Sequence, residues 1–185
     1  MRFGSELAFQ VDLAAAAIAV LALVFSFRAT KRQAHLERET LRQQRDSDVI
    51  NWSNDCLDAL CHAEMMMRPE YVRATVSSEY EKGKLACLAQ ISCCIDRGRL
   101  FFPNNQDGRF GLNKEAAFQG HRHPVLDALV GVYDLLSKTA HETSVNEVER
   151  QKIRDFSVGL KRDFISRVQA DVDPRRRLQF IKSHK

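Results

Sequence analysis

The chain has 185 residues, 44% of them hydrophobic, and carries 28 Lys and Arg against 24 Asp and Glu, a net charge of +4. So small a charge argues against a dedicated nucleic-acid binder, and eight glycines and four prolines exclude collagen-like and low-complexity chains. Five cysteines, an odd number without regular spacing, argue against a secreted disulfide scaffold and indicate a reducing compartment.

The most apolar stretch is residues 7–27, LAFQVDLAAAAIAVLALVFSF, whose strongly polar members Gln10 and Asp12 lie in its first third. As a helix it rises about 32 Å, the hydrocarbon thickness of a bilayer. A buried core helix is rarely apolar on every side, and no small-residue cleavage site follows the stretch as in a signal peptide. The sequence therefore predicts a transmembrane helix over 7–27, with residues 1–6 outside the membrane.

Charge predicts the orientation of this span. Residues 28–45 carry six basic residues against two acidic ones, whereas residues 1–27 have a net charge of −1. Basic flanks stay in the cytoplasm, so we expect the N-terminus outside and the rest of the chain inside. The basic residues nearest the membrane surface are expected to contact anionic lipid; they are Arg28, Lys31 and Arg32.

Residues 28–46 lack Gly and Pro and have only Leu36 and Leu41 as large apolar residues, which favours a solvated helical stalk. The small residues of the span permit close approach of helices in lipid, so a homo-oligomer or a protein partner is a further expectation.

Residues 47–173 show helical periodicity and no convincing alternation with period two, which predicts a cytoplasmic helical domain. The first apolar stripe ends before Pro69 and comprises Val49, Trp52, Cys56, Leu60, Ala63 and Met67. A second tract, 69–97, has Gly98 as its expected cap, Gly83 as a point where it can break, and a core face of Tyr80, Cys87, Leu88, Ile91, Cys94 and Ile95.

Pro124 opens a third helix, whose inward face is expected to be Val125, Leu126, Leu129, Val132, Tyr133 and Leu136. Ser144 and Glu147 have capping-box spacing for a fourth helix that ends at Asp173-Pro174. Its apolar residues are Val145, Val148, Phe156, Leu160, Phe164 and Val168. The predicted fold is all-α: an antiparallel bundle of about four helices with a long ordered loop, on a membrane helix and stalk.

That loop lies within residues 96–124, DRGRLFFPNNQDGRFGLNKEAAFQGHRHP, and is too long for an ordinary bundle connection. Four phenylalanines are expected to pin it to the bundle: Phe101, Phe102, Phe110 and Phe118. Its polar residues either converge on an anionic ligand or hold the loop through carbonyls and the acids Asp96 and Asp107. The candidate ligand-binding residues are Arg99, Asn104, Arg109, Lys114, His121, Arg122 and His123.

The run GRLFFPN, a glycine-containing polar loop and QGHR, over residues 85–135, resembles small single-span bacterial membrane proteins of unassigned function. The resemblance implies a place in the bacterial inner membrane and carries no activity.

The C-terminal residues 174–185 carry five basic residues around three apolar ones. They are expected either to form a solvated tail or to contact membrane or nucleic acid. In the membrane alternative, the residues at the membrane surface are Arg175, Arg176 and Arg177.

The chain contains no Gly-rich phosphate loop, GxSxG or HExxH motif, so no catalytic set, cofactor or metal site is predicted. The favoured hypothesis is a membrane-anchored scaffold or sensor that binds a partner at the inner membrane. The alternative is a tethered enzyme or effector acting on a phosphorylated or nucleic-acid ligand, with His121 or His123 as acid and base and Arg99, Arg109 and Arg122 binding charge.

Overall fold

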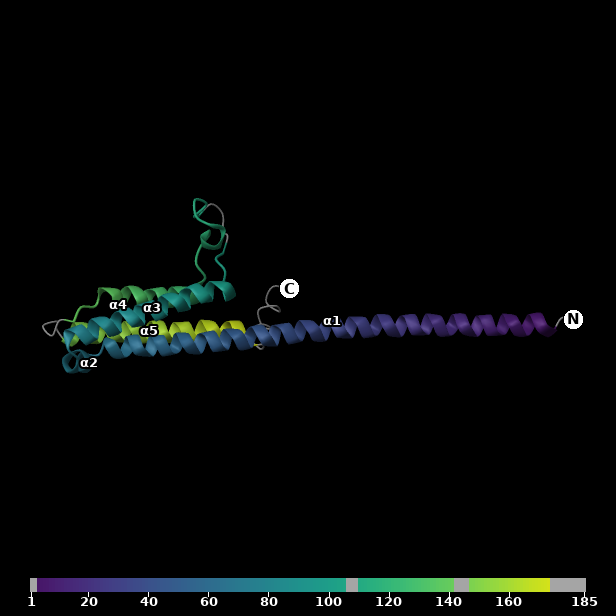
Figure 1. The fold of residues 1–185 in the computed structure, drawn as a ribbon, viewed down its shortest axis with the longest axis horizontal. Helices are drawn as coiled ribbons and strands as arrows, with labels where there is room; N and C mark the ends of the chain where they lie inside the picture. Colours follow the sequence, from purple (N-terminus) through teal and green to yellow (C-terminus); the bar gives the residue numbers. More distant parts are fainter. Residues whose placement is uncertain (1–2, 106–109, 142–146, 174–185) are drawn as a thin grey trace. The chain divides into compact units, whose positions relative to one another are not determined.

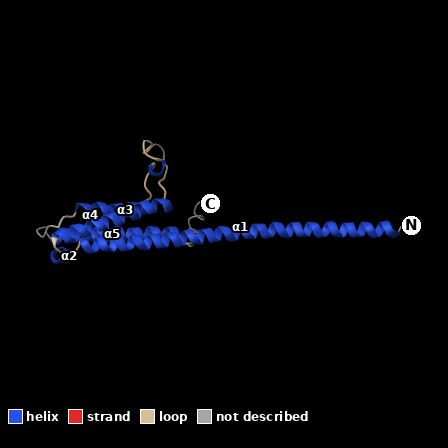
Figure 2. Cartoon of the chain, in the orientation of Figure 1, coloured by secondary structure: helices blue, strands red, loops and turns tan. Residues whose placement is uncertain are grey.

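A computed structural model describes residues 3–105, 110–141 and 147–173, except for the side chains of 3–21 and 24. The regular structure of these ranges is helical, as predicted (Figures 1 and 2). The helices are α1 Phe3–Met66, α2 Pro69–Ala74, α3 Ser77–Phe101, a 3-10 turn Ala116–Phe118, α4 Pro124–Lys138 and α5 Glu147–Val172. The chain divides into two compact units, 1–46 and 47–185.

The first unit is the N-terminal part of α1, whose helical backbone includes the predicted span and stalk. Among the described side chains, no helix is both long and apolar enough to cross a membrane. Most of the predicted span, residues 7–27, lies outside them. The stalk, 28–46, is helical as expected, and its two leucines, Leu36 and Leu41, are exposed.

The second unit is an up-and-down bundle of the C-terminal part of α1 with α3, α4 and α5 (Figure 1). All six residues of the predicted first stripe are buried. The largest residue of this stripe is Trp52, whose ring centroid lies 5.5 Å from that of Phe102 and 5.7 Å from that of Phe164 on α5. Its Nε1 donates to the carbonyl of Cys94, 2.9 Å away, so the indole is both packed and hydrogen-bonded.

Gly98 was expected to cap the second tract, but it lies inside α3, which continues to Phe101. A Cβ at Gly98 would lie 2.5 Å from Cδ2 of Leu126 and 2.6 Å from Cζ2 of Trp52. The glycine is therefore required by close packing, and the break in the tract falls at Thr75 and Val76 rather than at Gly83. The expected core face of α3 is buried, with Leu88 partly so.

The start of α4 at Pro124 and its inward face are confirmed, with Tyr133 partly buried. On α5 the expected face is partly wrong, because Val148 and Phe156 are each 60% exposed. The buried residues of α5 are Arg150, Ser157, Phe164 and Val168, and Leu160 packs partly buried against the core. Arg150 takes a buried position because its Nη2 donates to the carbonyl of Ala140 at 3.0 Å, beyond the end of α4. Val145 and Ser144 lie outside the described residues.

The packing around Gly98 predicts that Gly98→Ala lowers the free energy of unfolding by ~1–3 kcal/mol, the usual cost of overfilling a packed core. Gly159→Ala on α5 is the matched control, because a Cβ there meets nothing within 4 Å. It should leave stability unchanged or raise it by up to ~1 kcal/mol. Denaturant unfolding of the full chain in detergent, followed by circular dichroism, measures both. Equal effects of the two substitutions on the free energy of unfolding would contradict the conclusion that close packing requires a glycine at position 98.

Candidate functional site

Residues 103–123, here called the arm, leave the bundle after α3 and return to it at α4 (Figure 1). Asn105 and His121 join its two ends by an antiparallel bridge, with N to O distances of 2.8 and 2.9 Å. Further out, the amide of Gly120 donates to the carbonyl of Phe110. Gly111 and Gly120 have φ of 73° and 80°, which only glycine adopts without strain. The described residues of the arm, 103–105 and 110–123, therefore form a folded element with their own hydrogen bonds.

The four phenylalanines divide into two pairs. Phe102 is buried against Trp52, and Phe101 is partly buried, with its ring 6.0 Å from Trp52. This confirms the expected attachment for the first pair. The second pair is not buried in the bundle, because Phe110 and Phe118 are 54% and 42% exposed. Phe110 has its partner within the arm, whereas Phe118 contacts Arg99 at the end of α3.

These partners are polar residues. Phe110 stacks on the imidazole of His121, with ring centroids 4.5 Å apart and planes 16° from parallel. The guanidinium of Arg99 lies 4.8 Å above the ring of Phe118. Flat cationic and heteroaromatic groups are thus held against exposed rings instead of rings being buried in the bundle.

A cavity of about 640 Å³ lies between the arm, the end of α3 and the start of α4. Five of the seven predicted ligand-binding residues line it: Arg99, Asn104, Lys114, His121 and Arg122. Arg109 and Asp107 lie outside the described residues. The rest of the lining was not among the candidates and consists of Phe110, Glu115, Phe118, Gly120 and Asp127.

The cationic groups of this lining are weakly paired. Nη1 of Arg122 is 3.5 Å from Oδ1 of Asp127, and Nη1 of Arg99 is 3.4 Å from Oδ1 of Asn104. Arg99 also faces Asp96 at 3.7 Å. Charge-assisted hydrogen bonds are normally 2.7–2.9 Å long, so these contacts leave bonding capacity unused. Within the described part of the chain, the shielded Nε atoms of both arginines have no hydrogen-bond partner.

His123 is not part of the cavity. Its ring stacks on Phe102 at 5.0 Å, and its Nδ1 accepts a hydrogen bond from the amide of Val125 as the N-cap of α4. Burial lowers the pKa of His123 below the ordinary 6.5; nearby Asp171 opposes this effect and Arg167 adds to it. The two candidate acid-base histidines are therefore separated, with His121 in the cavity and His123 at the base of the arm.

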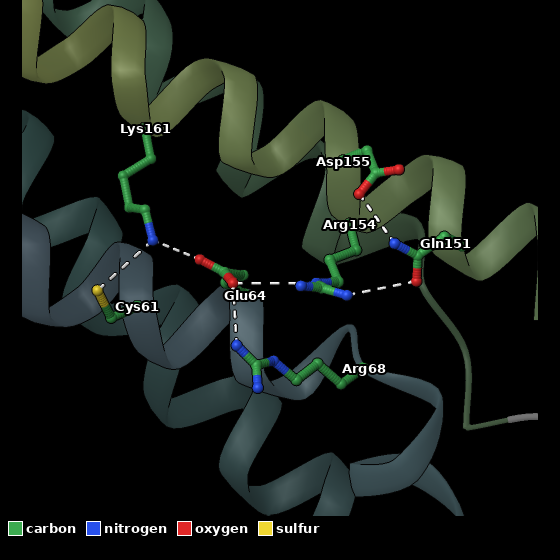
Figure 3. Close-up of polar contacts among 7 residues, drawn as sticks. All are labelled: Cys61, Glu64, Arg68, Gln151, Arg154, Asp155 and Lys161. Atoms are coloured by element: carbon green, nitrogen blue, oxygen red, sulfur yellow. Dashed lines mark hydrogen bonds and ion pairs between the residues drawn. The ribbon is translucent and has the colours of Figure 1, made fainter.

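A second charged cluster ties α1 to α5 and was not foreseen (Figure 3). Glu64 is nearly buried and forms ion pairs with Lys161, with Arg68 at 3.2 Å and with Arg154 at 4.0 Å. The hydrogen bond from Lys161 is the main reason why the pKa of Glu64 is lowered. All three cations already converge on one carboxylate, and Lys161 and Glu64 are 97 residues apart. Arg68 is an i, i+4 neighbour of Glu64, whereas the contacts with Lys161 and Arg154 join helices distant in sequence and leave no local pattern.

The remaining candidates do not form a site. Cys56, Cys87 and Cys94 are buried, as expected of small apolar side chains, whereas Cys61 and Cys93 are exposed. Among the described residues, no group of three potential metal ligands comes together. Arg28, Lys31 and Arg32 are exposed on α1, and Lys31 lies over the ring of Phe27. Arg175, Arg176 and Arg177 lie outside the described residues.

No protein-family profile, curated protein or solved structure matches this chain. The lining of the arm cavity comprises three cations, two carboxylates and two exposed rings.

The lowered pKa of His123 predicts a pH dependence of stability. The folded chain disfavours protonation of His123. The contribution of neutral His123 to the free energy of unfolding is therefore complete above pH ~6.5 and is lost as the pH falls through the lowered pKa. His123→Asn retains an acceptor for the Val125 amide, so it should reduce the loss of stability between pH 7 and pH 5. Thermal melts over this range measure the effect.

His35→Asn, at an exposed position of the stalk, is the matched control and should melt like the wild type at every pH. An unchanged pH dependence in His123→Asn would contradict the role assigned to burial of this ring.

Proposed function

We propose that the chain is a single-pass membrane protein whose cytoplasmic bundle senses an anionic ligand through the arm and binds a partner at the inner membrane. The observation that carries the proposal is the convergence of Arg99, Lys114 and Arg122 around one cavity in which Nη1 of both arginines makes only long contacts. The volume of about 640 Å³ falls within the ordinary range for small-molecule sites.

The cation geometry favours binding over catalysis. General acid-base chemistry requires groups held within hydrogen-bond reach of one another or of substrate. His121 lines the cavity, but its ring is stacked on Phe110, and within the described residues its side chain makes no hydrogen bond to an orienting carboxylate. His123 is engaged in capping α4. The tethered-enzyme alternative therefore has less support than a ligand-sensing module.

The membrane part of the proposal rests on residues 7–27 and on the basic residues that follow. The apolar sequence is long enough to span a bilayer as a helix, and the backbone of α1 is helical throughout it. We propose a bacterial inner-membrane location with the N-terminus outside. Both basic ends, through Arg28, Lys31, Arg32 and Arg175, Arg176, Arg177, would lie near anionic lipid. Self-association through the span and stalk belongs to the same proposal.

Ligand binding is tested by calorimetric titration of inorganic pyrophosphate into the full chain in detergent. We expect binding that Arg99→Gln and Arg122→Gln each weaken by about tenfold or more, because each removes a charged donor. Arg122→Gln should change stability by less than ~1 kcal/mol, since its pair with Asp127 is long and partly exposed. Arg162→Gln, an exposed arginine on α5, is the matched control and should bind like the wild type. Equal loss of binding in all three variants would reject the proposal, as would failure of both pyrophosphate and ADP to bind.

Topology is tested by labelling Ser5→Cys with a membrane-impermeant maleimide. We expect Ser5→Cys to react in intact spheroplasts, because residues 1–6 are placed outside. The exposed native thiols Cys61 and Cys93 provide the internal comparison and should react only after the membrane is permeabilised. Labelling of Cys61 and Cys93 in intact spheroplasts, or recovery of the chain in the soluble fraction, would reject the anchor and its orientation.

A further inference from the structure

The lining of the arm cavity combines three chemistries. Arg99, Lys114 and Arg122 supply positive charge, Phe110 and Phe118 supply aromatic surface, and Glu115 and Asp127 supply carboxylates. A simple anion would satisfy the cations, but it would leave the rings in water and would be repelled by both carboxylates. The cavity is therefore suited to a ligand that has an anionic end together with an aromatic part and hydrogen-bond donors.

The aromatic surface is the most specific of these features. Phe110 and Phe118 are 54% and 42% exposed although they belong to a folded arm. His121 stacks on Phe110, Arg99 lies over Phe118 and the Lys114 ammonium lies 5.7 Å from the Phe110 ring, yet about half of each phenylalanine stays exposed. Exposed rings paired with a guanidinium and an imidazole form the kind of platform on which nucleobases stack.

The charged groups match the remaining parts of such a ligand. Nη1 of Arg99 and Nη1 of Arg122 make only long contacts, at 3.4 and 3.5 Å, and planar guanidinium groups suit phosphate oxygens. Carboxylates accept hydrogen bonds from sugar hydroxyls and from exocyclic amino groups. Glu115 and Asp127 are therefore useful to a nucleotide, whereas they would be adverse to inorganic phosphate.

We propose that the arm cavity binds a nucleotide, with the base on the Phe110 and Phe118 platform and the phosphates on Arg99, Lys114 and Arg122. This inference rests on the proposed anion-sensing function and names its ligand class. A mononucleotide suits the site better than a nucleic-acid strand, because residues 46–173 carry a net charge of −4 and two of the lining residues are acidic.

The test titrates ADP, GDP, adenosine, pyrophosphate and a deoxythymidine decamer into the full chain in detergent. We expect ADP or GDP to bind at least tenfold more tightly than pyrophosphate, which carries a comparable charge, and adenosine to bind more weakly than either nucleotide. Phe110→Leu and Phe118→Leu should reduce the preference for nucleotide over pyrophosphate and change pyrophosphate affinity by less than twofold. Phe156→Leu, an exposed phenylalanine on α5, is the matched control and should retain the preference.

The outcomes separate this inference from the function on which it rests. If pyrophosphate binds as tightly as ADP and GDP, or if the leucine variants retain the preference, the nucleotide assignment is wrong while anion sensing stands. If the decamer binds more tightly than ADP and GDP, the platform serves single-stranded nucleic acid and the assignment is again wrong. If neither pyrophosphate nor nucleotide binds, both proposals fail.

Discussion

The packing of Trp52 against one row of α3 decides where the arm begins. Cys94, Gly98 and Phe102 follow one another at intervals of four residues, so they lie on the same side of the chain as it leaves the helix. Cys94 accepts the indole hydrogen bond, Gly98 admits the edge of the indole, and Phe102 lies against its ring. A side chain at Gly98 would force the indole away from α3 and would disturb the two contacts beside it.

The same contact positions the far end of the arm. Phe102 stacks on His123, which caps α4, so both ends of the arm meet next to Trp52. The bridge between Asn105 and His121 then keeps the two chain segments together as they leave the bundle. Arg99 precedes this bridge in the chain and Arg122 follows it. The bridge therefore explains why two arginines 23 positions apart line one cavity.

Polar side chains hold the other end of the bundle, near α2. Lys84 donates to the carbonyl of Thr139 and Arg150 to that of Ala140, so basic residues satisfy carbonyls beyond the end of α4. Nε2 of His141 lies 3.1 Å from the carbonyl of Val72 and 2.8 Å from that of Thr75. Because both carbonyls are acceptors, this nitrogen carries the proton. Hydrogen bonds thus hold the α2 end of the bundle, where the ring of His141 also packs on Tyr80 with centroids 5.0 Å apart.

Apolar periodicity and proline placement alone determined most of the helical fold. They located the buried stripe of α1, the faces of α3 and α4, and the starts of helices at Pro69 and Pro124. This works because an apolar stripe must be buried and because a proline restricts the residue before it, whatever the partner helix is. Local pattern also located the basic residues of the arm.

Tertiary structure decided the features that depend on contacts between distant residues. The apolar pattern predicted that Val148 and Phe156 face the core, but Arg150 and Ser157 are the buried residues of that part of α5. Arg150 can be buried because a carbonyl beyond the end of α4 accepts its hydrogen bond. Gly98 reads as a cap in the sequence, and only the positions of Trp52 and Leu126 show that it is a packing residue. The structure also showed that two rings and two carboxylates line the cavity together with its cations. The sequence could not predict this, because residues that come together across a loop form no periodic pattern.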